Sequence, residues 1–139
     1  MTDLTQTAAS VVKGDGAKVL RGVFGETLTA GAPTYRDATT KKWMKADNDA
    51  ASASGLATTD VGIALNGGAV NQPAEVQIDG EINLGAALTV GEVYAISSTA
   101  GAICPVGDLG SGDYTVVLGV ARTAALLVMG IVKGGAAKP

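Results

Sequence analysis

The sequence contains two similar halves, and this repeat limits the fold more than any other feature. A Leu-Thr-x-Gly segment at residues 28–31 recurs at residues 88–91, 60 positions later. An apolar segment with glycine in second place follows each copy, at residues 61–64 and at residues 118–121, which lie 57 positions apart. A stacked solenoid needs about three repeats or more, so two copies favour one compact domain with an internal pseudo-repeat. The alternative is chance similarity in a sequence rich in Ala, Gly, Val and Thr.

The spacing of strand and turn signals indicates the fold class. Short apolar or alternating segments are separated by Gly, Asn and Asp turns, at the spacing of about 8–12 residues that is typical of a barrel or sandwich. No long helical segment alternates with the strands, which argues against a βαβ fold. At 139 residues the chain fits a single domain. We therefore expect an all-β fold, a barrel or a sandwich, with one domain over residues 10–133.

Turn residues within this domain predict particular strand pairs. We expect hairpins with tips at residues 14–16, 38–41, 66–68 and 98–101, a turn at residues 79–80, and two final strands at residues 114–120 and 126–132. Residues 48–54 are predicted to form a short helical turn, because Asp47 or Asn48 can cap a segment rich in alanine. Residues 1–9 read as a flexible N-terminal arm and residues 134–139 as a flexible tail.

Composition limits what stabilises this domain and what it binds. Hydrophobic residues make up 47% of the chain but aromatic residues only 4%. Because stabilisation follows buried apolar area, we expect a modestly stable monomer that gains from binding further copies or another partner. The net charge is −3 and no basic stripe is present, which argues against a nucleic-acid partner. No apolar run reaches membrane length, so we expect no membrane span and no secretory signal.

The lack of histidine removes most catalytic and metal chemistry. It excludes Ser-His-Asp and Cys-His catalysis, and one cysteine, Cys104, is too little for a zinc site. We expect Cys104 to be a small buried hydrophobe, and we expect no catalytic residue, no cofactor and no metal. Two alternatives stay open: an enzyme with a converging carboxylate pair, and a biotinyl or lipoyl carrier domain. The carrier would use Lys45, which lies 14 residues after Gly31, too far for that compact hairpin.

Several residues are candidates for contacts with a partner. Trp43 is the single tryptophan and either anchors an interface or covers the end of the barrel. Tyr35 is its expected cross-strand partner. Arg21 and Arg36 either pair with carboxylates of a neighbouring subunit or are solvated. Residues 124–129 are continuously apolar, which predicts a strand buried on both faces, in the centre of the barrel or at a subunit interface.

The N-terminal arm is a further candidate contact. Thr2, Asp3, Leu4 and Thr5 belong to a polar segment with too little apolar content to fold alone. Such a segment can add a strand to the sheet edge of a partner. We expect that removal of residues 1–9 leaves the fold intact and weakens binding to the partner.

Five segments, taken in order, resemble a known family. They are residues 25–31, 45–47, 61–65, 88–94 and 118–121. Together they resemble the tailed-bacteriophage capsid decoration (cement) proteins, and the resemblance covers roughly residues 20–128. Each segment consists of small residues around a turn or a glycine, so the order and spacing of the segments carry the resemblance.

The resemblance implies a structural virion protein. Such a protein has a small β-barrel or β-tulip-like fold without a catalytic site, often with an N-terminal arm that lies on the capsid. It binds the outer surface of the assembled head, often as a trimer, and bridges neighbouring subunits of the major capsid protein. The implied partners are therefore the major capsid protein and further copies of this chain, in a particle made in the host cytoplasm. A neck, tail or head-fibre component with the same fold is the alternative.

Overall fold

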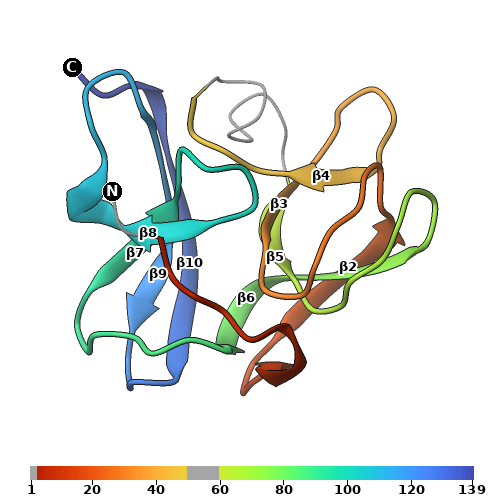
Figure 1. Cartoon of the computed structure of the whole chain (residues 1–139), viewed down its shortest axis with the longest axis horizontal. Coiled ribbons are helices and arrows are strands. Elements are labelled where there is room, and N and C mark those ends of the chain that lie inside the picture. The colour runs from red at the N-terminus through yellow and green to blue at the C-terminus, as the bar shows by residue number, and fades with distance from the viewer. Residues whose placement is uncertain (1–2, 50–59) are drawn as a thin grey trace.

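The chain folds as a curled half-barrel sheet of antiparallel strands, which confirms the all-β prediction (Figure 1). The computed structural model describes residues 3–49 and 60–139, and its helices in these ranges are two 3-10 turns. The strands are β1 (Val11–Lys13), β2 (Lys18–Val23), β3 (Pro33–Arg36), β4 (Trp43–Lys45), β5 (Val61–Ala64), β6 (Pro73–Leu84), β7 (Val93–Ile96), β8 (Ile103–Pro105), β9 (Tyr114–Ala121) and β10 (Leu126–Ala137), and the 3-10 turns are η1 (Ala8–Ser10) and η2 (Val106–Asp108).

The internal repeat is a structural repeat of strand pairing. In the first unit β3 pairs with β4 and β5, and β5 pairs with β6. In the second unit β7 pairs with β8 and β9, and β9 pairs with β10. Even the registers match: Thr34 lies opposite Gly62, and Tyr94 lies opposite Gly119, at the separations of 60 and 57 residues that the sequence shows. The two units form the two lobes of Figure 1, joined by the long strand β6.

Close approach of neighbouring strands explains the glycine that each repeat carries in β5 and β9. A Cβ atom on Gly62 would lie 2.4 Å from the carbonyl oxygen of Gln77, and one on Gly119 would lie 2.2 Å from that of Val128. Real Cβ atoms do not approach a carbonyl oxygen so closely, so any larger residue would push the paired strand away. The glycine of the repeated motif is therefore required by packing within the sheet.

Strand β6 pairs with strands of both units, and the turn and the hairpin that were predicted around it do not form. Gly80 has a φ of +87° inside β6 and bends the strand without reversing it, so the predicted turn at residues 79–80 is wrong. The amide of Gln77 donates to the carbonyls of Asp79 (3.0 Å) and Glu81 (2.7 Å) and supports this bend. The predicted first hairpin is also wrong, because β1 and β2 pair with opposite halves of β6 and not with each other.

The other predicted hairpins form, and the chain ends differ from expectation. The pairs β3–β4, β5–β6, β7–β8 and β9–β10 are antiparallel neighbours. Strand β10 continues to Ala137, where the sequence predicted a tail from residue 134. Most of the predicted helical turn at residues 48–54 lies outside the described residues, and Asn48 itself is buried, with its amide donating to the carbonyl of Ile96 (2.9 Å).

The core is divided between the two units. The larger cluster lies mainly in the second unit and contains Ile82, Leu118 and Leu127, whereas the first unit is filled by Phe24 and Trp43. The fully buried Cys104 belongs to a third, small cluster with Ala95 and Leu109, which confirms its prediction as a buried hydrophobe. Both units therefore form around side chains that face inward from the sheet.

Candidate functional site

The N-terminal arm lies against its own domain. The Asp3 carboxylate accepts a hydrogen bond from the Ser97 hydroxyl, and the Leu4 amide donates to the carbonyl of Ile103 (2.8 Å). Leu4 also packs against the larger core cluster, whereas Thr5 is exposed. Thr2 lies outside the described residues. The arm that was predicted to extend toward a partner is thus occupied, from Asp3 onward, by contacts within this chain.

Three of the predicted contact residues meet at the β3–β4 hairpin. Arg36 lies directly opposite Trp43, and its guanidinium carbon lies 5.1 Å from the centre of the indole ring. The same guanidinium forms an ion pair with Asp60, the residue just before β5. Tyr35 is opposite Met44, so the predicted Tyr35–Trp43 pair is wrong by one position, and a shift of one position moves a side chain to the other face of a sheet.

Trp43 is buried in the domain, and Arg21 and Arg36 lie close to carboxylates of the same chain. Trp43 has 0% of its surface exposed and belongs to the core cluster of the first unit, so its ring packs inside the domain in the single chain. The Arg36 ion pair with Asp60 lies within the chain, and the Arg21 guanidinium lies 4.0 Å from the Glu75 carboxylate on the neighbouring strand β6. In this structure both cations pair with carboxylates of their own chain.

The most distinctive surface is a set of valines on the outer face of β9 and β10, here called the valine face. Val120 lies opposite Val128, and Val117 lies opposite Val132. Val120, Val128 and Val132 are 43%, 39% and 60% exposed. An antiparallel sheet with one face in water normally carries polar side chains there, so four paired valines mark a surface suited to contact with another protein.

Strand β10 is a central strand of the sheet, and one of its faces is exposed in the single chain. β10 lies between β6 and β9, as predicted for a central strand, with Leu127 and Met129 in the core. The continuous apolar run predicts burial on both faces, within the barrel or at a subunit interface, and Val128 is 39% exposed in the single chain. The sequence shows valines in both strands, but that Val120 lies opposite Val128 is evident only from the strand register.

An ion pair borders the valine face. Glu81 of β6 lies opposite Val128, and its carboxylate accepts a hydrogen bond from the Arg122 guanidinium at 2.9 Å. The Arg122 side chain is 58% exposed and the Glu81 side chain only 15%. The apolar surface is therefore bordered, on the β6 side, by charges that neutralise one another.

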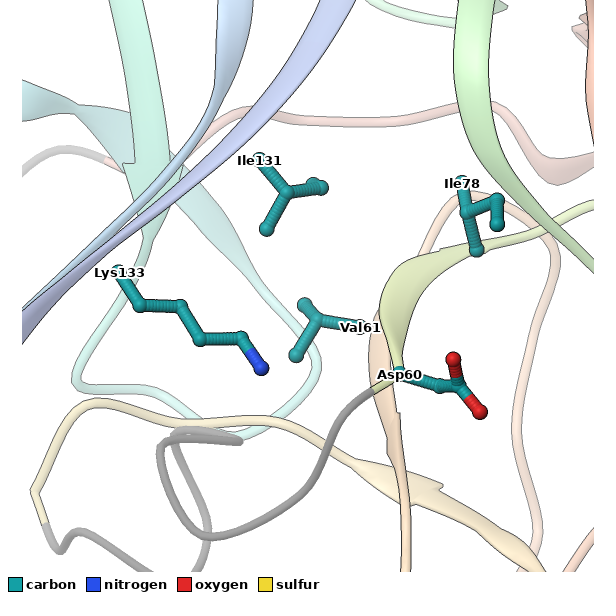
Figure 2. Close-up of a pocket in the computed structure, with 5 residues that line it drawn as sticks. All are labelled: Asp60, Val61, Ile78, Ile131 and Lys133. Carbon is teal, nitrogen blue, oxygen red and sulfur yellow. The ribbon is translucent and has the colours of Figure 1, made fainter.

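A pocket of about 400 Å³ lies between the two units. Val61, Ile78 and Ile131 form its apolar wall, and Asp60 and Lys133 add charge (Figure 2). Burial lowers the pKa of Lys133, and the negative charge of Asp60 opposes that shift. Figure 2 shows the Lys133 side chain extending toward Val61, while the Asp60 carboxylate points away from it, toward its partner Arg36. The pocket thus combines an aliphatic wall with one amine.

Neither a metal site nor a membrane-spanning helix is found in the described part of the chain. Among residues 3–49 and 60–139, no three or more acidic, cysteine or histidine side chains gather as a metal site. Within the same ranges, no helix is long and apolar enough to cross a membrane. The sequence matches no protein-family model, and no curated protein sequence matches it significantly.

Proposed function

We propose that this protein is a structural virion protein that decorates the outer surface of a tailed-phage head and binds the major capsid protein through its valine face. The proposal starts from the resemblance of five ordered segments to capsid decoration proteins. The register of the two units places their shared motifs at equivalent points of one sheet, as expected if the order and spacing of these motifs reflect a fold.

The observation that supports the proposal most is the valine face itself. Its two cross-strand pairs bring together four β-branched side chains, of which Val120, Val128 and Val132 are exposed. Side chains that are stiff at χ1 lose little conformational entropy when a partner covers them. A rigid apolar sheet face therefore suits a protein that binds a preformed protein lattice, and many copies on that lattice add avidity.

Charge supports the same orientation. The net charge of −3 disfavours close contact with packaged DNA, and suits the exterior of a particle. We further propose that the protein acts as a homo-oligomer, a trimer, because a core with so few large side chains gains from additional buried area. A neck, tail or head-fibre component would use the same face but at a different place on the virion.

The test is cryo-electron microscopy of virions purified from host cells in which the protein is made, with its copy number on the virion measured by quantitative mass spectrometry. We expect density over the head at threefold or quasi-threefold positions, with β9 and β10 facing the major capsid protein. Density confined to the neck, the tail or a fibre, at low copy number, would replace head decoration by the alternative structural role. Virions without the protein would overturn both.

A further inference from the structure

In each unit a backbone amide from outside the hairpin donates to the carbonyl of the first residue of the hairpin's second strand. The donor comes from a different segment of the chain in the two units. In the first unit the amide of Gly25, just after β2, donates to the carbonyl of Trp43 at 2.9 Å, beside a bridge between Phe24 and Trp43. In the second unit the equivalent carbonyl is that of Ile103, 60 positions after Trp43. Its donor is Leu4 of the N-terminal arm, at 2.8 Å. The arm thus takes the place that the chain after β2 takes in the first unit.

The residue of the second unit that corresponds to Gly25 contacts the arm. The repeat equivalent of Gly25 is Gly85, whose carbonyl accepts a hydrogen bond from the Thr7 amide at 2.7 Å. A Cβ atom on Gly85 would lie 2.3 Å from the carbonyl oxygen of Thr7. Residues 3–7 therefore fill a slot between the end of β6 and the edge strand β8, and Figure 1 shows this segment, in red, running between the lobes.

Residues 3–7 contact the domain through five hydrogen bonds and the packing of one apolar side chain. The Gln6 amide donates to the carbonyls of Gly31 (2.9 Å) and Leu84 (3.2 Å), and so joins the arm to both units. Leu4 is the arm residue that packs against the core. The arm continues into η1, a turn without buried residues. A segment held by a few hydrogen bonds and one apolar side chain opens far more readily than the core strands.

We propose that the slot between Gly85 and Ile103 also accepts residues 3–7 of a second copy, so that neighbouring chains exchange their arms. A second copy carries the segment already seated in the slot, so an exchanged arm makes the same contacts. A chain's own arm is present near its slot at an effective concentration on the order of millimolar. A neighbour's arm competes with it when the neighbour is held close enough to reach a similar local concentration. Exchange is therefore expected wherever copies are held side by side. This inference goes beyond the capsid role, because it concerns only contacts between copies.

The test uses disulfides between full-length chains that each carry one cysteine. Cys104→Ala removes the native thiol, which lies close to Ser97. Chains with Asp3→Cys and chains with Ser97→Cys are then mixed and oxidised. Because the Asp3 carboxylate contacts the Ser97 hydroxyl, exchange is expected to yield at least tenfold more covalent heterodimer than a mixture of Thr5→Cys and Ser97→Cys chains. The exposed Thr5 makes this second mixture the matched control. Equal yields would overturn the proposal.

A second variant tests exchange without a disulfide. Deleting Ala8 and Ala9 from η1 shortens the connection, so that the arm no longer reaches its own slot but still reaches that of a neighbour. Analytical ultracentrifugation is expected to show at least a tenfold tighter association than for the unaltered chain. A monomer with lowered stability would instead show that the arm binds only within its own chain. Neither measurement uses phage particles, so failure here is distinct from failure of the proposed capsid role.

Discussion

At the scale of single residues, Arg36 shows how one side chain stabilises the β3–β4 hairpin. Its guanidinium lies over the Trp43 ring and pairs with Asp60. The Arg36 side chain is 30% exposed and the Asp60 side chain 23%. Water therefore screens this ion pair less than a pair at an open surface. The planar guanidinium makes both contacts at once, which an ammonium group cannot do with the same geometry.

We therefore expect Arg36→Lys to lower the free energy of unfolding by about 1 kcal/mol, measured by urea denaturation. The matched control is Arg21→Lys, because Arg21 is 81% exposed and lies 4.0 Å from Glu75. That substitution should change stability by only a few tenths of a kcal/mol. Equal losses at both positions would contradict the role assigned to the stacked guanidinium.

Cys104 gives a second prediction, in reactivity. Burial raises the pKa of its thiol to about 11, and nearby Asp3 adds to the shift. Only the thiolate reacts, so at pH 8 we expect alkylation by iodoacetamide to be about 100-fold slower in the native protein than in urea. The native rate should rise about tenfold per pH unit up to pH 11. A native rate equal to that in urea would show that Cys104 is not buried.

At the scale of elements, β6 connects the two units through its bend at Gly80. Besides its positive φ, Gly80 lies against the turn between β1 and β2: a Cβ atom there would be 2.4 Å from the carbonyl carbon and oxygen of Gly16. Two glycines thus allow the backbones to meet at this point. The bend lets one strand pair with β2 along its first half and with β1 and β10 along its second half.

We expect Gly80→Ala to destabilise the protein by about 3 kcal/mol, from a strained φ together with a backbone clash. Gly91→Ala is the matched control, because Gly91 has a φ of +84° and nothing within 4 Å of an added Cβ. It should lose only about 1 kcal/mol. Chemical denaturation measures both, and similar losses would mean that strain alone, not the close approach, sets the requirement at Gly80.

The arm gives a prediction that reverses the sequence-based one. Because the Leu4 amide hydrogen-bonds to Ile103 and Leu4 packs against the core, we now expect removal of residues 1–7 to destabilise the second unit. Amide hydrogen exchange in β7 and β8 should become at least tenfold faster, while that of β3 and β4 stays unchanged. Unchanged exchange throughout would restore the view of the arm as an independent extension.

At the scale of the whole molecule, two surfaces have different proposed partners. The valine face on β9 and β10 is proposed to contact the capsid, and the slot beside β8 to contact a second copy. The slot lies between β6 and the edge strand β8, whereas β9 and β10 lie in the interior of the strand order. Substitutions at one surface should therefore leave the function of the other intact.

We expect Val120→Thr combined with Val128→Thr to lower occupancy on heads at least tenfold, because two methyl groups of the contact become hydroxyls. Threonine keeps the β-branched shape, so the fold should persist. The control is Val70→Thr with Val90→Thr, since both valines are 52% and 65% exposed and lie in loops. Sedimentation should show the same oligomer for both variants. Full occupancy by the Val120/Val128 variant would remove the valine face from the capsid contact.

Local signals alone determined much of this protein. The all-β class, the repeat, the tips of most hairpins and the buried Cys104 follow from turn chemistry and alternation over a few residues. The repeat separations of 60 and 57 residues also carried the correct relative register of the two units. These features depend on neighbours in the sequence, and so they are readable without the tertiary structure.

Only the tertiary structure decided which strands became partners over long distances. Segment 14–16 looks like a hairpin turn, yet β1 and β2 pair with β6, because every strand offers the same main-chain donors and acceptors. The run at residues 126–129 looks buried on both faces, yet Val128 is 39% exposed in the single chain, because none of the described residues fully covers that side of β10. The polar arm looks independent, yet it closes the second unit. Such choices depend on packing between distant segments of small, similar side chains, which carry little information about their partners.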